Sequence, residues 1–126
     1  MPTDLIVEAY TSTTKMSLRE IVERLNRHLG ATLVATLANV NDRKLPYRWA
    51  REGGSTPGAE ATRRLTAAHR IWLQLADAES DDVARAWFVG ENPFLDEQAP
   101  VLTLREGKTK ETLQAAQSFV GGTWQG

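Results

Sequence analysis

Apolar residues recur at helical spacing in several separate segments of the chain. The first such segment has five apolar residues three or four positions apart, Leu18, Ile21, Val22, Leu25 and Leu29. Ser17 and Glu20 fit a capping box at its start, and Gly30 suits its end. Residues 1–16 show no sustained period, so we expect a loose arm there, with at most a short strand at residues 5–7.

The same pattern predicts helices along the rest of the chain. They are expected over residues 32–38, around residues 47–49 with an end by residue 53, and over residues 57–76, 81–89, 100–105 and 109–120. Thr56 is expected to cap the helix that starts at Pro57, because proline is tolerated in a first turn. Val83 is expected to face inward together with Trp87 and Phe88. The pattern therefore predicts an all-α fold.

Composition narrows the class of protein. The 126 residues have a formal net charge of −1 and contain no cysteine, which excludes disulfides, thiolate nucleophiles and cysteine metal ligands. No apolar run approaches the ~20 residues of a membrane span. The first residues lack a basic segment followed by an apolar stretch, so we expect no secretory signal and a cytoplasmic protein.

Charge is distributed unevenly along the chain. From Arg43 to Arg70 there are seven cations and two acids, whereas Asp77 to Asp82 contains four acids and no cation. A basic middle on a neutral protein favours one face for nucleic acid. The alternative is two solvated faces of opposite charge.

The residues needed for catalysis are not grouped in the sequence. His28 and His69 are the two histidines, neither has a partner at metal-ligand spacing, and both are expected in solvent. Ser55 and Ser80 are expected to be helix caps rather than nucleophiles. We therefore expect no enzyme, no cofactor and no metal.

Residues 32–51 combine the parts of a helix-turn-helix. Ala35 is small enough for a second helix to cross closely, and Asn39 stands where a turn glycine is common. Leu45 and Trp49, four positions apart, would hold the second helix against the core. The side chains left to reach phosphates and bases are Arg43, Lys44, Tyr47, Arg48 and Arg51. The alternative is a helical hairpin that contacts no DNA.

This segment resembles the Xre-type helix-turn-helix proteins, whose arginine-tryptophan-x-x-glycine ending is similar to residues 48–53. Two features depart from that pattern. The stretch between Asn41 and Trp49 is one residue longer, and Pro46 lies inside the expected recognition helix. Because proline is tolerated only in a first turn, we expect this helix to begin near Leu45 and to be short.

Residues 80–122 resemble the C-terminal domain of the Xre/MbcA/ParS-like antitoxins. The family pattern has a tryptophan helix, an asparagine-proline turn with a leucine, a proline, a leucine-arginine pair, and a glycine before the final helix. The matching positions are Trp87, Asn92, Pro93, Leu95, Pro100, Leu104, Arg105 and Gly107. The double glycine that usually follows the leucine is replaced by residues 96–98.

The resemblance implies an antitoxin of a type II toxin-antitoxin system, encoded beside a RES-domain toxin that degrades NAD. Its C-terminal region would obstruct the toxin's NAD pocket, while the helix-turn-helix represses the shared operon. The residues implied to contact the toxin are Asn92, Pro93, Phe94, Leu104, Arg105, Gly122, Trp124, Gln125 and Gly126. Trp124 either anchors this plug or folds back on its own helix bundle.

These expectations divide the chain into a flexible arm (1–16), a helix-turn-helix region (17–56), a connecting helix (57–79), a toxin-binding domain (80–120) and a tail (121–126). DNA binding at two half-sites would require a homodimer. Two alternatives are a stand-alone helix-turn-helix regulator of phage origin and a helical module that binds only protein.

Overall fold

The computed structural model describes residues 18–122, and the regular structure of this part of the chain is helical. The helices are residues 18–29, α2 (Ala31–Ala38), α3 (Leu45–Ala50), α4 (Ala59–Ala78), α5 (Asp81–Val89), the short 3-10 helix η1 (Pro93–Leu95), α6 (Pro100–Arg105) and α7 (Thr109–Gly121). The expected all-α fold is confirmed for these residues. The arm, the Ser17 cap and the strand expected at residues 5–7 lie outside them.

Single residues explain where several helices begin or end. The Ser80 hydroxyl accepts a hydrogen bond from the Val83 N–H at 3.1 Å and so caps α5, as the sequence predicts. Asn39 ends α2 in the left-handed conformation at φ 61°, which asparagine adopts more readily than most residues. The predicted bounds of the helices at 81–89 and 100–105 agree with α5 and α6.

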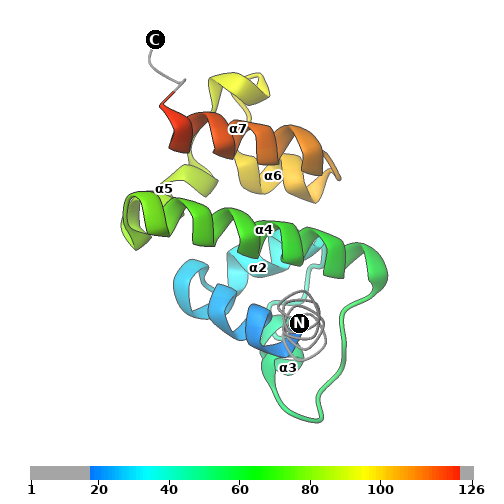
Figure 1. Ribbon diagram of the computed structural model, residues 1–126. Coiled ribbons are helices and arrows are strands. Elements are labelled where there is room, and N and C mark those ends of the chain that lie inside the picture. Colours follow the sequence, from blue (N-terminus) through cyan, green and yellow to red (C-terminus); the bar gives the residue numbers. More distant parts are fainter. Residues whose placement is uncertain (1–17, 123–126) are drawn as a thin grey trace, which may run out of the picture.

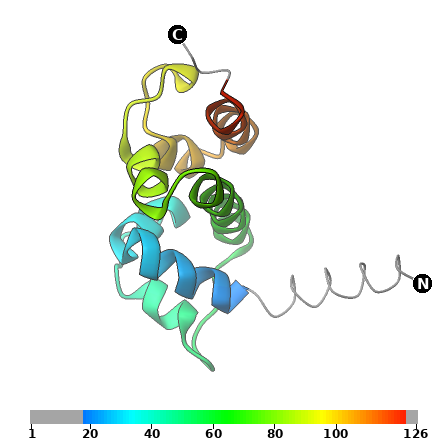
Figure 2. The same cartoon turned by 60° about the vertical axis from the view of Figure 1, so that its left-hand side comes forward.

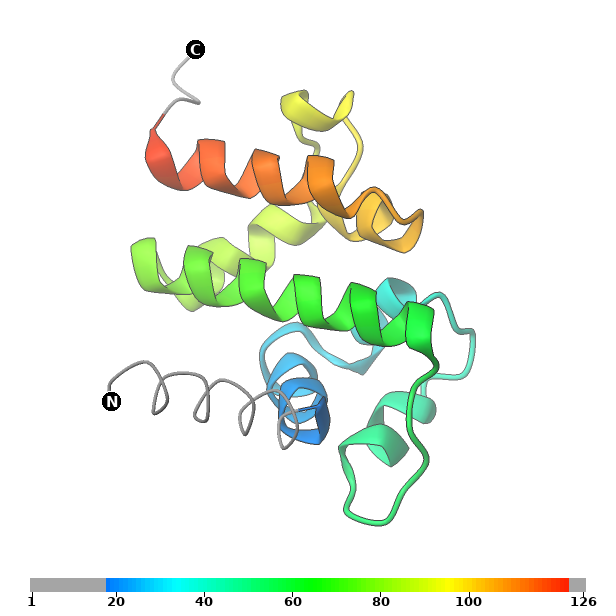
Figure 3. The ribbon, with the colours of Figure 1, turned by 45° about the vertical axis from the view of Figure 1, so that its right-hand side comes forward.

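Helix α4 is the element against which both ends of the described chain pack. Figure 1 shows α4 in green, with α2 and α3 on one side and α6 and α7 on the other, and Figure 3 shows the same order. In Figure 2, α4 and α7 are seen nearly end-on and lie side by side. Leu65, Ile71 and Leu75 of α4 are fully buried in one core that includes residues of every α-helix named above.

A buried hydrogen bond joins α6 to α7. The hydroxyl oxygens of Thr103 and Thr112 are 2.6 Å apart, so one hydroxyl donates to the other. Both side chains are buried, and such a bond stabilises a fold by about 1 kcal/mol. The two short segments are thereby held as one layer on α4.

Three expectations about helix ends and faces are wrong. Thr56 does not cap α4, because the helix begins at Ala59 with Gly58 before it and without a side-chain cap. Val83 is 36% exposed, because α5 buries Ala84, Trp87 and Phe88 on its other face. Gly121, expected in the tail, is the last residue of α7.

The expected solvent exposure of the histidines is also wrong. His69 is buried within α4, with 8% of its surface exposed. His28 is half-buried, because its ring stacks on Trp72 and its Nδ1 contacts Asp81 at the start of α5. The face that carries these histidines was polar in sequence but is covered by residues more than forty positions away. Within residues 18–122, no helix has both the length and the apolar character needed to cross a membrane.

Candidate functional site

The helices α2 and α3 are joined by a linker that the backbone fixes tightly. After Asn39, the Val40 N–H donates to the Ala35 carbonyl at 3.0 Å, which turns the chain back across the end of α2. Ala35 is 3% exposed, consistent with the close contact expected of it. The linker occupies residues 39–44, and α3 has six residues, a length of about 9 Å. The expected short helix beginning at Leu45 is confirmed.

Helix α3 is anchored on its inner face. Trp49 is 6% exposed, and the partly buried Leu45 packs against the same core. Pro46 is buried in the first turn, where its missing N–H leaves no hydrogen bond unmade. Its carbonyl accepts a hydrogen bond from Asn26 Nδ2 at 3.0 Å, which ties α3 to the first described helix. Pro46 therefore starts this helix and does not interrupt it.

The five side chains predicted to contact DNA all lie exposed around α3, namely Arg43, Lys44, Tyr47, Arg48 and Arg51. Tyr47 has 63% of its surface exposed, the most among the large hydrophobic side chains of residues 18–122. Between residues 42 and 51 there are four cations and one carboxylate, Asp42. A hollow between this segment and the first turn of α2 is lined by Ala31, Thr32, Asn41, Asp42, Arg43, Lys44 and Tyr47. The outer surface is thus basic, aromatic and concave.

Asp42 is a functional residue that the sequence analysis treated only as a helix breaker. Its Oδ1 accepts a hydrogen bond from the Lys44 N–H at 2.9 Å, which shapes the backbone just before α3. Its Oδ2 lies 3.9 Å from Arg48 Nη1, and both side chains are about half exposed. An aspartate two positions before the N–H that it caps is a known turn pattern, so spacing alone could have indicated this role. The carboxylate also offsets part of the positive charge of the surface.

Gly54 holds the far end of α3 in place. A Cβ at this position would lie 2.0 Å from the carbonyl oxygen of Arg48, so only glycine allows this approach. The Gly54 N–H donates to the Arg51 carbonyl at 3.0 Å. Gly53, at φ 77°, provides the preceding turn. The residues that resemble the Xre-type ending therefore close α3 against the chain that leads to α4.

Two of the residues implied to contact a toxin are inside the fold, which corrects that expectation. Leu104 is fully buried in the core beneath α7, and Asn92 is 2% exposed. The Asn92 side chain accepts a hydrogen bond from the Phe94 N–H at 2.9 Å and caps η1. Both residues support the local structure and present no side chain to a partner.

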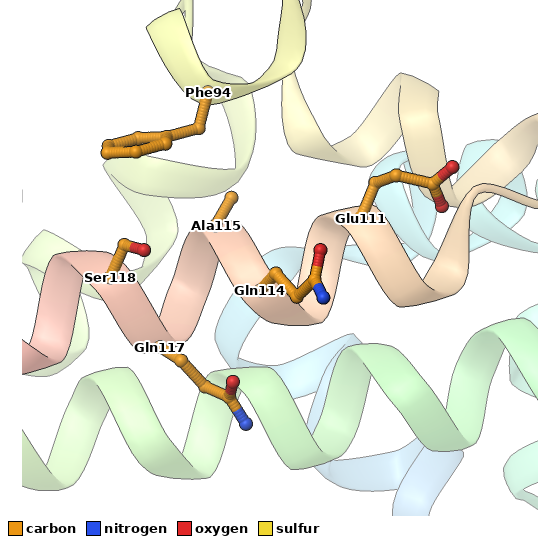
Figure 4. Close-up of a pocket in the computed structure, with 6 residues that line it drawn as sticks. All are labelled: Phe94, Glu111, Gln114, Ala115, Gln117 and Ser118. Carbon is orange, nitrogen blue, oxygen red and sulfur yellow. The ribbon is translucent and has the colours of Figure 1, made fainter.

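The remaining C-terminal candidates lie at or near the surface. Pro93 and Gly122 are exposed, Phe94 is 50% exposed, and Arg105 is half-buried in the last turn of α6. Figure 4 shows Phe94 reaching from η1 over α7, where a hollow is lined by Phe94, Glu111, Gln114, Ala115, Gln117 and Ser118. Trp124, Gln125 and Gly126 lie outside the described residues.

Comparisons of the chain with protein-family models, with curated proteins and with solved structures match nothing. The function is therefore argued from the two surfaces above. One is the basic surface around α3, and the other is the surface formed by η1, α6 and α7. They lie on opposite sides of α4 (Figure 1).

Proposed function

We propose that this protein is a DNA-binding antitoxin. In this proposal α2 and α3 form a helix-turn-helix that binds the operator of the protein's own operon. The side of the molecule formed by η1, α6 and α7, with the C-terminal tail, binds and blocks a RES-domain toxin that degrades NAD. Both activities would take place in the cytoplasm, and a homodimer would place two α3 helices in successive half-sites.

The observation that carries the DNA-binding part is the exposed surface around α3. Recognition helices contact base edges with residues near their N-terminus, and Arg43, Lys44 and Tyr47 flank the N-terminus of α3. Their side chains are exposed while Leu45 and Trp49 hold the helix from beneath. Cations supply affinity for phosphates, and Tyr47 adds an aromatic surface with a hydroxyl.

A binding measurement on the DNA upstream of the gene tests this part. Lys44→Ala and Tyr47→Ala are expected to weaken binding of a labelled promoter fragment by about tenfold. Arg63→Ala is the matched control, because Arg63 is an exposed arginine on α4 that pairs with Glu60 at 2.8 Å. Loss of a phosphate contact should also reduce the salt dependence of binding by about one unit of slope. Promoter binding that is unchanged in both variants would refute the assignment.

The toxin-binding part is supported by the resemblance of residues 80–122 and by the exposed position of Phe94. Aromatic side chains are frequent anchors of protein interfaces. Co-expression with the product of the neighbouring gene tests it, with growth and cellular NAD as readouts. Phe94→Ala is expected to weaken protection, whereas Val89→Ala, which removes a similarly exposed apolar side chain from α5, should not. If the folded wild-type chain gives no protection, this part fails.

One observation favours a second candidate function, a stand-alone helix-turn-helix regulator without a toxin partner. Asn92 and Leu104, two of the residues that carry the resemblance to the antitoxin domain, are explained by packing alone. Such a regulator would bind its promoter as above and would have no toxin gene beside its own. The two candidates therefore differ in the co-expression result and agree in the DNA-binding result.

A further inference from the structure

The hollow beside Phe94 lies close to the point where the described chain ends. Its volume is about 520 Å³, which is within the range of pockets that bind small molecules and leaves room for an indole ring. In Figure 4 the Phe94 ring lies over Ser118 and Ala115, at the end of the hollow nearer the C-terminus of α7. Glu111 lines the opposite end. The end near Phe94 thus offers an aromatic ring beside a helix surface.

The end of α7 directs the chain toward this hollow. Gly122 adopts the left-handed conformation at φ 77°, and its N–H points to the carbonyls of Ser118 and Phe119. Beyond such a left-handed cap, the chain commonly folds back against the last helical turn and makes an apolar contact with it. Ser118 is four residues before Gly122, a rise of about 6 Å along the helix.

The length of the remaining chain limits what it can reach. Four residues follow Gly122, and the second of them is Trp124. Two residues extend at most about 7 Å, so Trp124 can reach the Ser118 and Phe94 end of the hollow but not the Glu111 end without its side chain stretched along α7. The hollow and the tryptophan are therefore matched in position as well as in chemistry.

We propose that the hollow between Phe94 and α7 binds the indole of this chain's own Trp124. The Phe94 ring supplies an aromatic partner, and the side chains of Gln114 and Ser118 supply polar groups for the indole N–H. This interaction goes beyond the proposed function and does not depend on it. A toxin that takes up the tail must first withdraw Trp124 from this hollow, so the free protein competes with its own partner.

Nuclear magnetic resonance of the indole N–H groups in the full chain tests the proposal. The Trp124 signal is assigned by its loss in Trp124→Phe. It is expected away from the position that it has in a peptide of residues 121–126, and Phe94→Ala is expected to move it to that position. Leu102→Ala is the control, because Leu102 is 42% exposed on α6 and does not line the hollow.

A second measurement keeps the test independent of the Phe94 substitution. A chain that ends at Gly122 is expected to show shifted amide signals for Gln114 and Ser118, with the signals of residues 18–29 unchanged. A Trp124 signal at the peptide position in the wild type, or one that Phe94→Ala leaves in place, would overturn the proposal. Unshifted Gln114 and Ser118 amides in the shortened chain would also overturn it. The promoter and co-expression experiments can succeed or fail regardless of these results.

Discussion

The imidazole of His28 stacks on the indole of Trp72, with ring centroids 4.2 Å apart and ring planes at 28°. Both rings also contact Asp81, since His28 Nδ1 lies 3.0 Å from Oδ2 and Trp72 Nε1 donates to Oδ1 at 2.9 Å. The hydrogen bonds from His28 and then from Trp72 lower the pKa of Asp81 below its ordinary value. One carboxylate thus joins the first described helix, α4 and α5.

Replacing Asp81 by alanine is expected to lower the free energy of unfolding by about 1 kcal/mol more than replacing Asp82. Both carboxylates lie in the first turn of α5, where negative charge is favourable, so Asp82→Ala removes that shared contribution. Only Asp81 accepts the hydrogen bond from Trp72, and its half-exposed pair with His28 adds little. Urea denaturation at pH 7 measures the difference. Equal losses in the two variants would contradict the role assigned to Asp81.

His69 is expected to make the fold sensitive to mild acid. Burial, followed by the charges of Arg24 and His28, lowers the pKa of His69 below its ordinary value of 6.5. The unfolded chain then binds a proton at a higher pH than the native chain does. The free energy of unfolding is therefore at its full value above pH 6.5 and falls as the pH decreases toward the native pKa.

His69→Gln removes this titration, so its stability should fall less than that of the wild type between about pH 7.5 and pH 5. Urea denaturation across that range provides the comparison. Asp81 does not contribute to this window, because its lowered pKa acts below 3.8. Parallel pH profiles for the two proteins would rule out His69 as the source of acid sensitivity.

Gly54→Ala is expected to destabilise the protein by about 1–3 kcal/mol, because the added Cβ would overlap the carbonyl oxygen of Arg48. Gly58→Ala is the matched control, since a Cβ at Gly58 meets no atom within 4 Å. Its effect should stay within about 0.5 kcal/mol, the range of an ordinary surface substitution. Thermal unfolding distinguishes the two variants. A Gly54→Ala protein as stable as Gly58→Ala would show that α3 does not need this close approach.

Asp42→Asn is expected to strengthen binding of non-specific DNA severalfold at low salt. The amide oxygen of asparagine can still accept the hydrogen bond from the Lys44 N–H, so the backbone before α3 is preserved. The substitution removes the carboxylate that lies 3.9 Å from Arg48, which frees this guanidinium for phosphate. Asp77→Asn on α4 changes the net charge equally and is the control. Fluorescence anisotropy at two salt concentrations measures both, and equal gains would refute a local effect at α3.

The sequence predicted those features that depend on neighbouring residues. The bounds of α5 and α6 follow from Ser80, from Pro100 and from helical periodicity, all of which act within a turn or two. The short α3 was predicted because Pro46 can occupy only a first turn. The five exposed side chains around α3 were identified because Leu45 and Trp49 define the opposite face.

Features that depend on distant residues were not predicted. His28 is covered by Trp72 and by Asp81, which is 53 positions away, and no local pattern shows that contact. Leu104 and Asn92 were assigned to a partner surface from the family pattern, but packing under α7 and capping of η1 bury them. A pattern shared with a family does not distinguish residues kept for folding from residues kept for contact.

The position of α4 constrains how this protein can be divided or changed. Because its buried side chains form one core with the helices on both sides, a fragment that contains only residues 18–56 or only residues 80–122 would leave apolar surface open to water. A substitution that reshapes α4 for one side alters the support of the other. Changes of DNA sequence preference and changes of protein partner would therefore have to arise at the outer surfaces, with the shared helix kept constant.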